Sequence, residues 1–374
     1  MRRHIYADNA ATTKLDKRAF EAMVPWLLEE YGDASQLYAF ARKSKRALTD
    51  ARSTIAECIG AFPEEIHFTS GGTESDNWII KSSALSDTGK RATIVSTFEH
   101  HAILRSCAAI ERLGYPVAYV WPSDEGYITP DTLEKYITND TRLVSIMFAN
   151  NEIGSIQPIQ ELCKTAHSHG ALFHTDAVQA VGHIEINAHE LGVDFLSASA
   201  HKFNGPKGIG FLYIRKDVEL PLYVDGSAQE HAHRAGTENV AAIVGMATAL
   251  KENCDFLKRN QQHILSLERQ LISRLDEAGI TYKRNGGDSR LPGLLSLSFP
   301  GRDGEAIQHH MDLVGISISS GSTRDHANTR ISHVLQAIRL DESYAKGTIR
   351  ISLGKDDTAE DVEELASTLI KIIT

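Results

Sequence analysis

The feature that most constrains the fold is a succession of short apolar segments that alternate with helical patterns between residues 18 and 257. Each segment is four to six residues long, and most have apolar residues at successive positions, as strands buried on both faces of a sheet do. The segments are residues 65–69, 92–96, 143–148, 171–175, 195–198 and 210–214. Because helical patterns separate them, they predict a mainly parallel sheet covered by helices on each side. We therefore predict an α/β fold.

The pattern changes in the last third of the chain. A long amphipathic helix is predicted over residues 255–278, and the segments 294–299 and 348–353 predict two further strands. The last helix has apolar residues on one face only, with Thr358 as its predicted N-cap and Asp361 at the third helical position. These elements predict a smaller α+β domain. The predicted division is a large domain of residues 18–257 and a small domain of residues 1–17 and 258–374.

Charge and composition exclude several classes of function. Lys and Arg total 39 and Asp and Glu total 49, a formal net charge of −10, so nucleic acid and anionic membranes are not expected partners. The first residues turn polar early, without the apolar stretch of a signal peptide, and no run is long enough for a membrane helix. The 4 Cys lack paired spacing and suggest neither a disulfide framework nor a zinc site. We expect a cytoplasmic protein.

Lys202 is the first candidate for chemistry. It lies in the run Ser-Ala-His-Lys-Phe-Asn-Gly-Pro-Lys-Gly of residues 199–208, directly after a predicted strand. Ligands of α/β folds bind at such strand ends, and an amine there can form a Schiff base with a carbonyl substrate or with pyridoxal phosphate. The alternative is an ordinary solvated lysine.

Two further runs place polar groups at strand ends. Residues 68–77 pass from a strand through Gly71 and Gly72 into a helix, where free backbone amides can hold a phosphate. Asp176 follows the strand of residues 171–175, and a carboxylate there could keep a bound pyridine nitrogen protonated. Taken alone, the first run could be only a turn and Asp176 only a helix cap.

Together with residues 99–101 and 150–154, these runs resemble the pyridoxal 5'-phosphate (PLP) enzymes of the NifS/IscS-type cysteine desulfurase family, in the class V aminotransferase group. The resemblance extends over nearly the whole chain, from residues 6–13 to residues 350–354. It implies PLP fold type I, with a large domain whose mainly parallel sheet is flanked by helices and a smaller C-terminal α+β domain.

The resemblance implies a set of cofactor contacts. Lys202 would hold the cofactor as a Schiff base and move the Cα proton, His100 would stack on the ring, and Asp176 would meet its nitrogen. The other expected contacts are Gln179 and Asn151 at the ring, Gly72, Thr73, Ser199 and His201 at the phosphate, and Thr237 from a partner subunit. A homodimer follows, because Thr237 would reach the neighbouring active site.

The resemblance also indicates the substrate side. Arg350 would form a bidentate pair with the α-carboxylate of a small L-amino acid, for which a planar guanidinium suits better than an ammonium. Asn9, Tyr38 and Arg324 are the other expected substrate contacts, and no metal is expected. A sulfur-acceptor or scaffold protein is a further expected partner.

The chain departs from the family pattern in one loop. Desulfurases carry a Cys nucleophile there, in a run resembling S-S-G-S-A-C-T-S-G shortly before a Ser-His-Val-Leu helix. Residues 319–327 read Ser-Ser-Gly-Ser-Thr-Arg-Asp-His-Ala, so Arg324 stands where the Cys is expected. A guanidinium cannot accept sulfur, so no persulfide is expected at this position. Tyr38 likewise replaces a His of the family pattern, and residues 226–234 also differ from it.

These observations favour a PLP-dependent enzyme that deprotonates Cα of a small L-amino acid and cleaves a bond from Cβ to sulfur or another heteroatom, without a loop persulfide. Three alternatives remain open. Arg324, with His231 or His233, could bind an acidic amino acid or a sulfinate for an aminotransferase or lyase reaction. A true desulfurase could pass sulfur to an external thiol or to a partner's Cys. A chain without catalysis could serve as a scaffold for sulfur transfer.

Overall fold

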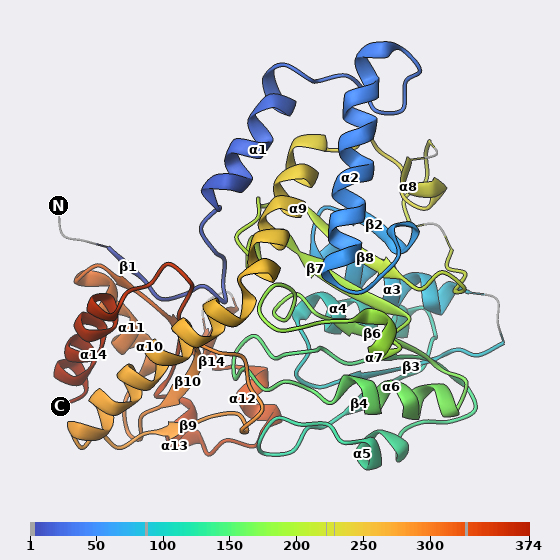
Figure 1. Ribbon diagram of the computed structural model, residues 1–374. Coiled ribbons are helices and arrows are strands. Elements are labelled where there is room, and N and C mark those ends of the chain that lie inside the picture. Colours follow the sequence, from blue (N-terminus) through green and yellow to red (C-terminus); the bar gives the residue numbers. More distant parts are fainter. Residues whose placement is uncertain (1–3, 87–88, 222, 228, 326–327) are drawn as a thin grey trace.

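A seven-stranded sheet forms the centre of the molecule (Figure 1). The computed structural model describes residues 4–86, 89–221, 223–227, 229–325 and 328–374, without the side chains of residues 231–232 and 322–330. In spatial order the strands are β2 (Ile66–Thr69), β8 (Gly210–Ile214), β7 (Phe195–Ser199), β6 (Leu172–Asp176), β5 (Thr141–Ser145), β3 (Ala92–Ser96) and β4 (Val117–Val120). The strands from β7 to β4 are parallel, and β8 runs antiparallel to both β7 and β2. The predicted mainly parallel sheet is confirmed.

Helices cover both faces of this sheet, because successive strand residues point to opposite sides. Ile94 and Val144 pack into one core with helices α2 and α9, while the adjacent Val95 and Leu143 pack into another with α3 and α4. The flanking helices are α1 (Lys17–Leu28), α2 (Arg42–Cys58), α3 (Gly72–Leu85), α4 (His101–Arg112), α6 (Ile159–Ser168) and α9 (Val240–Asp255). The strands are therefore apolar on both faces because each face packs against helices.

A second core lies beside the sheet and is built mainly from the C-terminal segment. Its antiparallel sheet has the order β12 (Ser319–Ser320), β15 (Thr348–Ser352), β10 (Leu294–Ser298) and β9 (Lys283–Arg284). Helices α10 (Leu257–Glu277), α11 (Gly304–Leu313) and α14 (Ala359–Ile373) pack on it. The N-terminal strand β1 (Ile5–Tyr6) joins this part through parallel pairing with β11 (Ile316–Ser317). These two bodies are consistent with the predicted domains, whose boundaries stay a prediction.

The remaining elements are short. They are η1 (Ala39–Ala41), η2 (Pro63–Glu65), η3 (Ala200–Lys202), α5 (Pro130–Glu134), α7 (Ala188–Leu191), α8 (Gln229–Ala232), α12 (His333–Ala337), α13 (Glu342–Ala345), and the hairpin of β13 (Ser322–Asp325) and β14 (Asn328–Ile331). Across the described ranges, the model contains no helix with the length and apolar character needed to cross a membrane.

Three details differ from the sequence prediction. The helix predicted over 255–278 is the end of α9 followed by α10, because Phe256 leaves helical geometry between them. The strand predicted over 143–148 begins earlier and ends at residue 145, as β5. The strand β4 was not predicted. The predicted cap of the last helix is confirmed, since Thr358 and Asp361 form a capping box at the start of α14.

Candidate active site

A cavity of about 300 Å³ lies at the carboxyl ends of the parallel strands, where α/β folds bind their ligands. Its lining comes from the residues that follow β5, β6 and β7, from the start of α3 and α4, from residues 10–11 and from β15. The predicted residues among the lining are Gly72, Thr73, His100, Asn151, Asp176, Gln179, Ser199, His201, Lys202 and Arg350. Three strand ends and four separate stretches of chain thus meet in one space.

Lys202 ends the short helix η3 that follows β7, and its amine points at the backbone of the N-terminal segment. Its Nζ donates to the carbonyl of Ala10 and, at 2.9 Å, to that of Ala11. No carboxylate in the described part of the chain forms an ion pair with it. Burial, followed by the nearby Arg350 guanidinium, lowers the pKa of Lys202 from 10.5 to about 8. The amine is therefore available as a nucleophile and as a base near neutral pH.

Asp176 is the last residue of β6 and is 5% exposed. Its Oδ1 accepts a hydrogen bond of 2.9 Å from the amide of Val178. Burial raises the pKa of this carboxyl, whereas the neighbouring His100 and Lys202 act in the opposite direction. A buried acid at the edge of a cavity suits a basic ring nitrogen.

Asp76 is a second acid of the cavity that the sequence analysis missed. It lies on α3, is 1% exposed, and its Oδ1 has no hydrogen bond to any residue described. Burial, and next the charge of Asp176, raise the pKa of Asp76 well above its ordinary value. Its neighbour His174, at 3.8 Å, offers no charge, because burial lowers the pKa of that imidazole to about 3. Burial raises the pKa of both acids, and at Asp176 the nearby His100 and Lys202 act against that rise.

The start of α3 forms an anion cradle. Gly71, with φ of +144°, turns the chain from β2 into the helix, so that the amides of Gly72 and Thr73 are free of intrahelical partners. Ser199 and His201 line the same end, and burial lowers the pKa of His201 to about 4, which leaves it neutral. A second cavity of about 360 Å³ opens here beside the first. The sequence prediction of a phosphate-sized anion site agrees with this geometry.

Arg350 reaches the cavity from β15 of the second core. Its Nη1 donates to the carbonyl of Asn151 at 3.0 Å, and its Nη2 donates to Asp8 Oδ1 at 2.8 Å and Ser319 Oγ at 3.0 Å. Ser319 also donates to Asp8 at 2.9 Å, which closes a triangle of side chains. Asp8 and Ser319 were not predicted from the sequence as site residues, although Asp8 stands in the run of residues 6–13. This triangle fixes the direction of the guanidinium.

Three predicted site residues do not line this cavity, and the side chain of a fourth is not described. Asn9 does not line it, because its amide donates to Ser352 O at 2.9 Å and lies against other pockets. Tyr38 is 51% exposed, and Thr237 is exposed as well. Arg324 belongs to β13, but its side chain lies outside the described residues, as does that of His231. The expected substrate contacts of this group stay predictions.

Comparison with known proteins gives the family. Residues 5–365 match the family model described as Aminotransferase class-V. The chain belongs to this class V family. The cysteine desulfurase IscS of Dictyoglomus turgidum is 46% identical over 376 residues, which cover 100% of this chain and 95% of that relative.

Solved structures agree with this assignment to the class V family. A NifS-like protein superposes with a TM-score of 0.93 at 36% identity, covering 99% of each chain. A structure described as SspA in complex with cysteine has a TM-score of 0.82 at 34% identity and covers 95% of this chain and 100% of that one. PLP fold type I and the relation to NifS/IscS desulfurases are confirmed, and the chain is a PLP-dependent enzyme.

The residues of the cavity fit this cofactor. Lys202 offers an amine of lowered pKa, Asp176 offers an acid without an ion-pair partner among the described residues, and the start of α3 offers free amides. The cavity volume of about 300 Å³ is at the lower end for a small-molecule site. An aldehyde, a basic ring nitrogen and a phosphate would each meet a complementary group.

Proposed function

We propose that this class V enzyme acts on a small L-amino acid and cleaves a bond from Cβ to sulfur or another heteroatom, without a persulfide on its loop. The observation that supports this most is the meeting of Lys202, Asp176 and Arg350 in one cavity. PLP, when bound, supplies an electron sink for the charge left after Cα deprotonation. The substrate class is supported by Arg350 and by the relatives named as cysteine desulfurases.

The chain's own residues supply binding and proton transfer. Arg350 binds the α-carboxylate, with Asp8 and Ser319 holding its guanidinium in place. Lys202, whose pKa is lowered to about 8, takes the Cα proton and returns it, since a base with a pKa near the working pH is most effective. Asp176 meets the ring nitrogen at the end of β6, and the cradle at Gly72 and Thr73 holds the phosphate.

Arg324 distinguishes this proposal from an ordinary desulfurase. By its place in the loop sequence, it stands where a Cys would accept sulfur, so sulfur from a cysteine substrate would leave with an external thiol or a partner protein. An acidic amino acid or a sulfinate, held by Arg324, is the alternative substrate. Both outcomes keep the same roles for Lys202 and Arg350.

A panel of L-amino acids tests the proposal. Each is added to the holoenzyme, the cofactor absorbance is recorded, and products are analysed for any that change it. We expect a response to L-cysteine with release of sulfide or alanine that requires an added thiol. A response confined to acidic amino acids would refute the cysteine proposal. The absence of any response, with a cofactor band that Lys202→Ala does not remove, would favour the scaffold.

We further propose a homodimer in which Thr237 contacts the phosphate site of the partner subunit. Thr237 is exposed and lies outside its own cavity, and the second cavity beside the cradle is open. Several large apolar side chains close to Tyr38 in the sequence are also exposed, which is typical of an interface. These side chains are Phe20, Leu27, Leu28, Tyr31, Leu37 and Phe40.

Subunit mixing tests the dimer. In a mixed dimer, Lys202→Ala in one subunit and Thr237→Ala in the other fall in the same site if Thr237 acts across the interface. A mixed dimer therefore has one intact site, and about half of the wild-type activity per mixed dimer should return. No recovery after mixing, with exchange of subunits shown by mass, would contradict the proposal. A cytoplasmic location and a sulfur-acceptor partner also remain proposals.

A further inference from the structure

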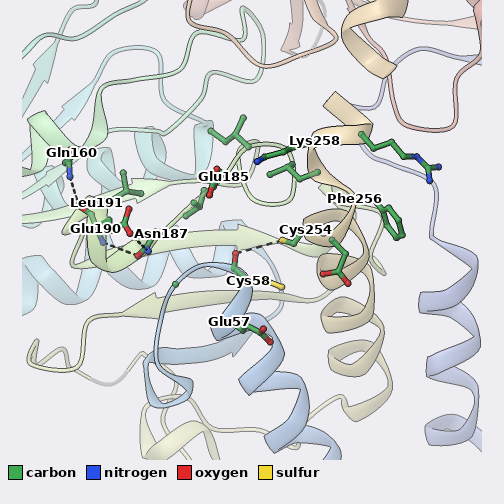
Figure 2. A pocket seen from close by; sticks show the side chains of 16 residues that line it. Glu57, Cys58, Gln160, Glu185, Asn187, Glu190, Leu191, Cys254, Phe256 and Lys258 are labelled. Atoms are coloured by element: carbon green, nitrogen blue, oxygen red, sulfur yellow. Dashed lines mark hydrogen bonds between the residues drawn. The ribbon is translucent and has the colours of Figure 1, made fainter. Parts of the chain in front are cut away.

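A groove away from the active site contains two cysteines. It has a volume of about 870 Å³ and runs between the end of α2, residues 184–191 and the junction of α9 with α10 (Figure 2). Cys58 is the last residue of α2, and Cys254 is the last but one of α9. Both line the groove and are partly exposed, whereas Cys107 and Cys163 are buried.

The two thiols lie next to one another although 195 residues separate them in sequence (from 59 to 253). Cys254 Sγ donates to the carbonyl of Cys58 at 3.9 Å, a contact that Figure 2 marks with a dashed line. The contact between the thiols raises the pKa of Cys58 and lowers that of Cys254. One member of the pair is thus the better nucleophile, and the other is placed to react with it.

We propose that Cys58 and Cys254 are a redox-sensitive thiol pair, which a hydroperoxide entering the groove oxidises to a disulfide that fastens α2 to α9. In the first step the Cys254 thiolate attacks the peroxide, forming a sulfenic acid while the O–O bond breaks and water leaves. In the second step Cys58 attacks that sulfur, an S–S bond forms and a second water leaves. The two thiols lose two electrons and two protons in total, and hydrogen peroxide becomes two molecules of water.

The pair has a direct mechanical connection to the active site. Asn253, the residue before Cys254, donates to the carbonyl of Phe203 at 2.7 Å, and Phe203 follows Lys202. On the other side of Cys254, Phe256 is the break between α9 and α10, where the chain passes into the second core. A disulfide at Cys254 would therefore restrain both the segment that carries Lys202 and the junction between the two bodies.

Peptide mapping of the holoenzyme tests the proposal. The protein is reduced, treated with hydrogen peroxide, alkylated with N-ethylmaleimide in denaturant and digested without reductant. We expect a linked peptide that contains Cys58 and Cys254, reversal by dithiothreitol, and a higher Tm of the oxidised form. Hydrogen exchange across residues 253–257 should also become slower. Absence of the link, or equal linkage through Cys107 or Cys163, would overturn the proposal.

Three variants sharpen the test. Cys58→Ser should abolish the link and leave Cys254 as a sulfenic acid that dimedone captures, and Cys254→Ser should abolish it without a dimedone adduct on Cys58. Cys163→Ser is the matched control and should link as the wild type does. If the single variants do not fold, native labelling of the wild type decides, because N-ethylmaleimide should then modify Cys254 before the buried thiols. These readouts follow thiols and stability, so they are independent of the proposed function.

Discussion

The state of the Lys202 amine gives the most direct test of the active-site geometry. Burial and the Arg350 guanidinium lower its pKa from 10.5 to about 8. At pH 7 roughly 10% of such an amine is unprotonated, against about 0.03% of an ordinary lysine, so the reactive fraction rises about 300-fold. The shift corresponds to about 3.4 kcal/mol between the two protonation states. The largest cause is burial of the amine, and the charge of Arg350 is the next.

Competitive acetylation of the cofactor-free protein measures this pKa. The rate of acetylation at Lys202 is followed by mass spectrometry from pH 6 to 11, with the exposed Lys207 of the same loop as internal reference. We expect the rate at Lys202 to rise tenfold per pH unit and to level off near pH 8. Restricted access would lower the rate at every pH but would not move the point at which it levels off. Arg350→Gln should move that point upward, because it removes a positive charge and leaves Asp8 unpaired. A rate at Lys202 that still rises at pH 10 would refute the reasoning.

Three further predictions concern buried charges. Arg52→Met should cost about 3 to 5 kcal/mol in the free energy of unfolding measured with urea, because Glu230, with a side chain 2% exposed, would lose a bidentate partner at 2.9 and 3.0 Å. Burial raises the pKa of Glu99 to about 8, so between pH 4.5 and 8 the folded state holds a proton that the unfolded state has released. The free energy of unfolding should therefore fall as the pH rises from 4.5 to 8. Glu99→Gln should reduce that fall by a few kcal/mol, which thermal unfolding at several pH values would show. Asp8→Asn should raise KM for the amino acid several-fold with a smaller change in kcat, measured by steady-state kinetics, because it loosens the guanidinium of Arg350.

Each of these has a control or an opposing outcome. Arg339→Met removes an exposed partner of Asp124 and should change stability far less than Arg52→Met. A pH dependence of stability that is identical with and without the Gln at position 99 would show that this carboxyl titrates normally. A loss of kcat equal to the rise in KM in the Asp8 variant would mean that Asp8 acts in the chemical step.

The strand ends were predictable because their signals are local. Lys202 and Asp176 each follow an apolar run directly, so the placement of the strand also places the side chain. The break at Phe256 was not predictable, because the helical pattern continues through it without Gly or Pro. The same holds for the pair Cys58 and Cys254, since only the packing of α2 against α9 brings them together.

The active site joins groups from two bodies, and the N-terminal segment connects them. The carbonyl of Ala10 accepts a hydrogen bond from Lys202, and its amide donates one of 2.9 Å to Ser352 Oγ. Because Ser352 and Arg350 lie on the same strand, β15, Ala10 links the Lys202 amine to the strand that carries Arg350. Thr13 adds a hydrogen bond of 2.9 Å to the carbonyl of His201. The hydrogen bonds that make these connections come from residues outside β13 and β14. Under the proposed function, a change of sequence in that hairpin would alter the substrate or the fate of its sulfur while these hydrogen bonds between the amine and the strand of Arg350 stay as they are.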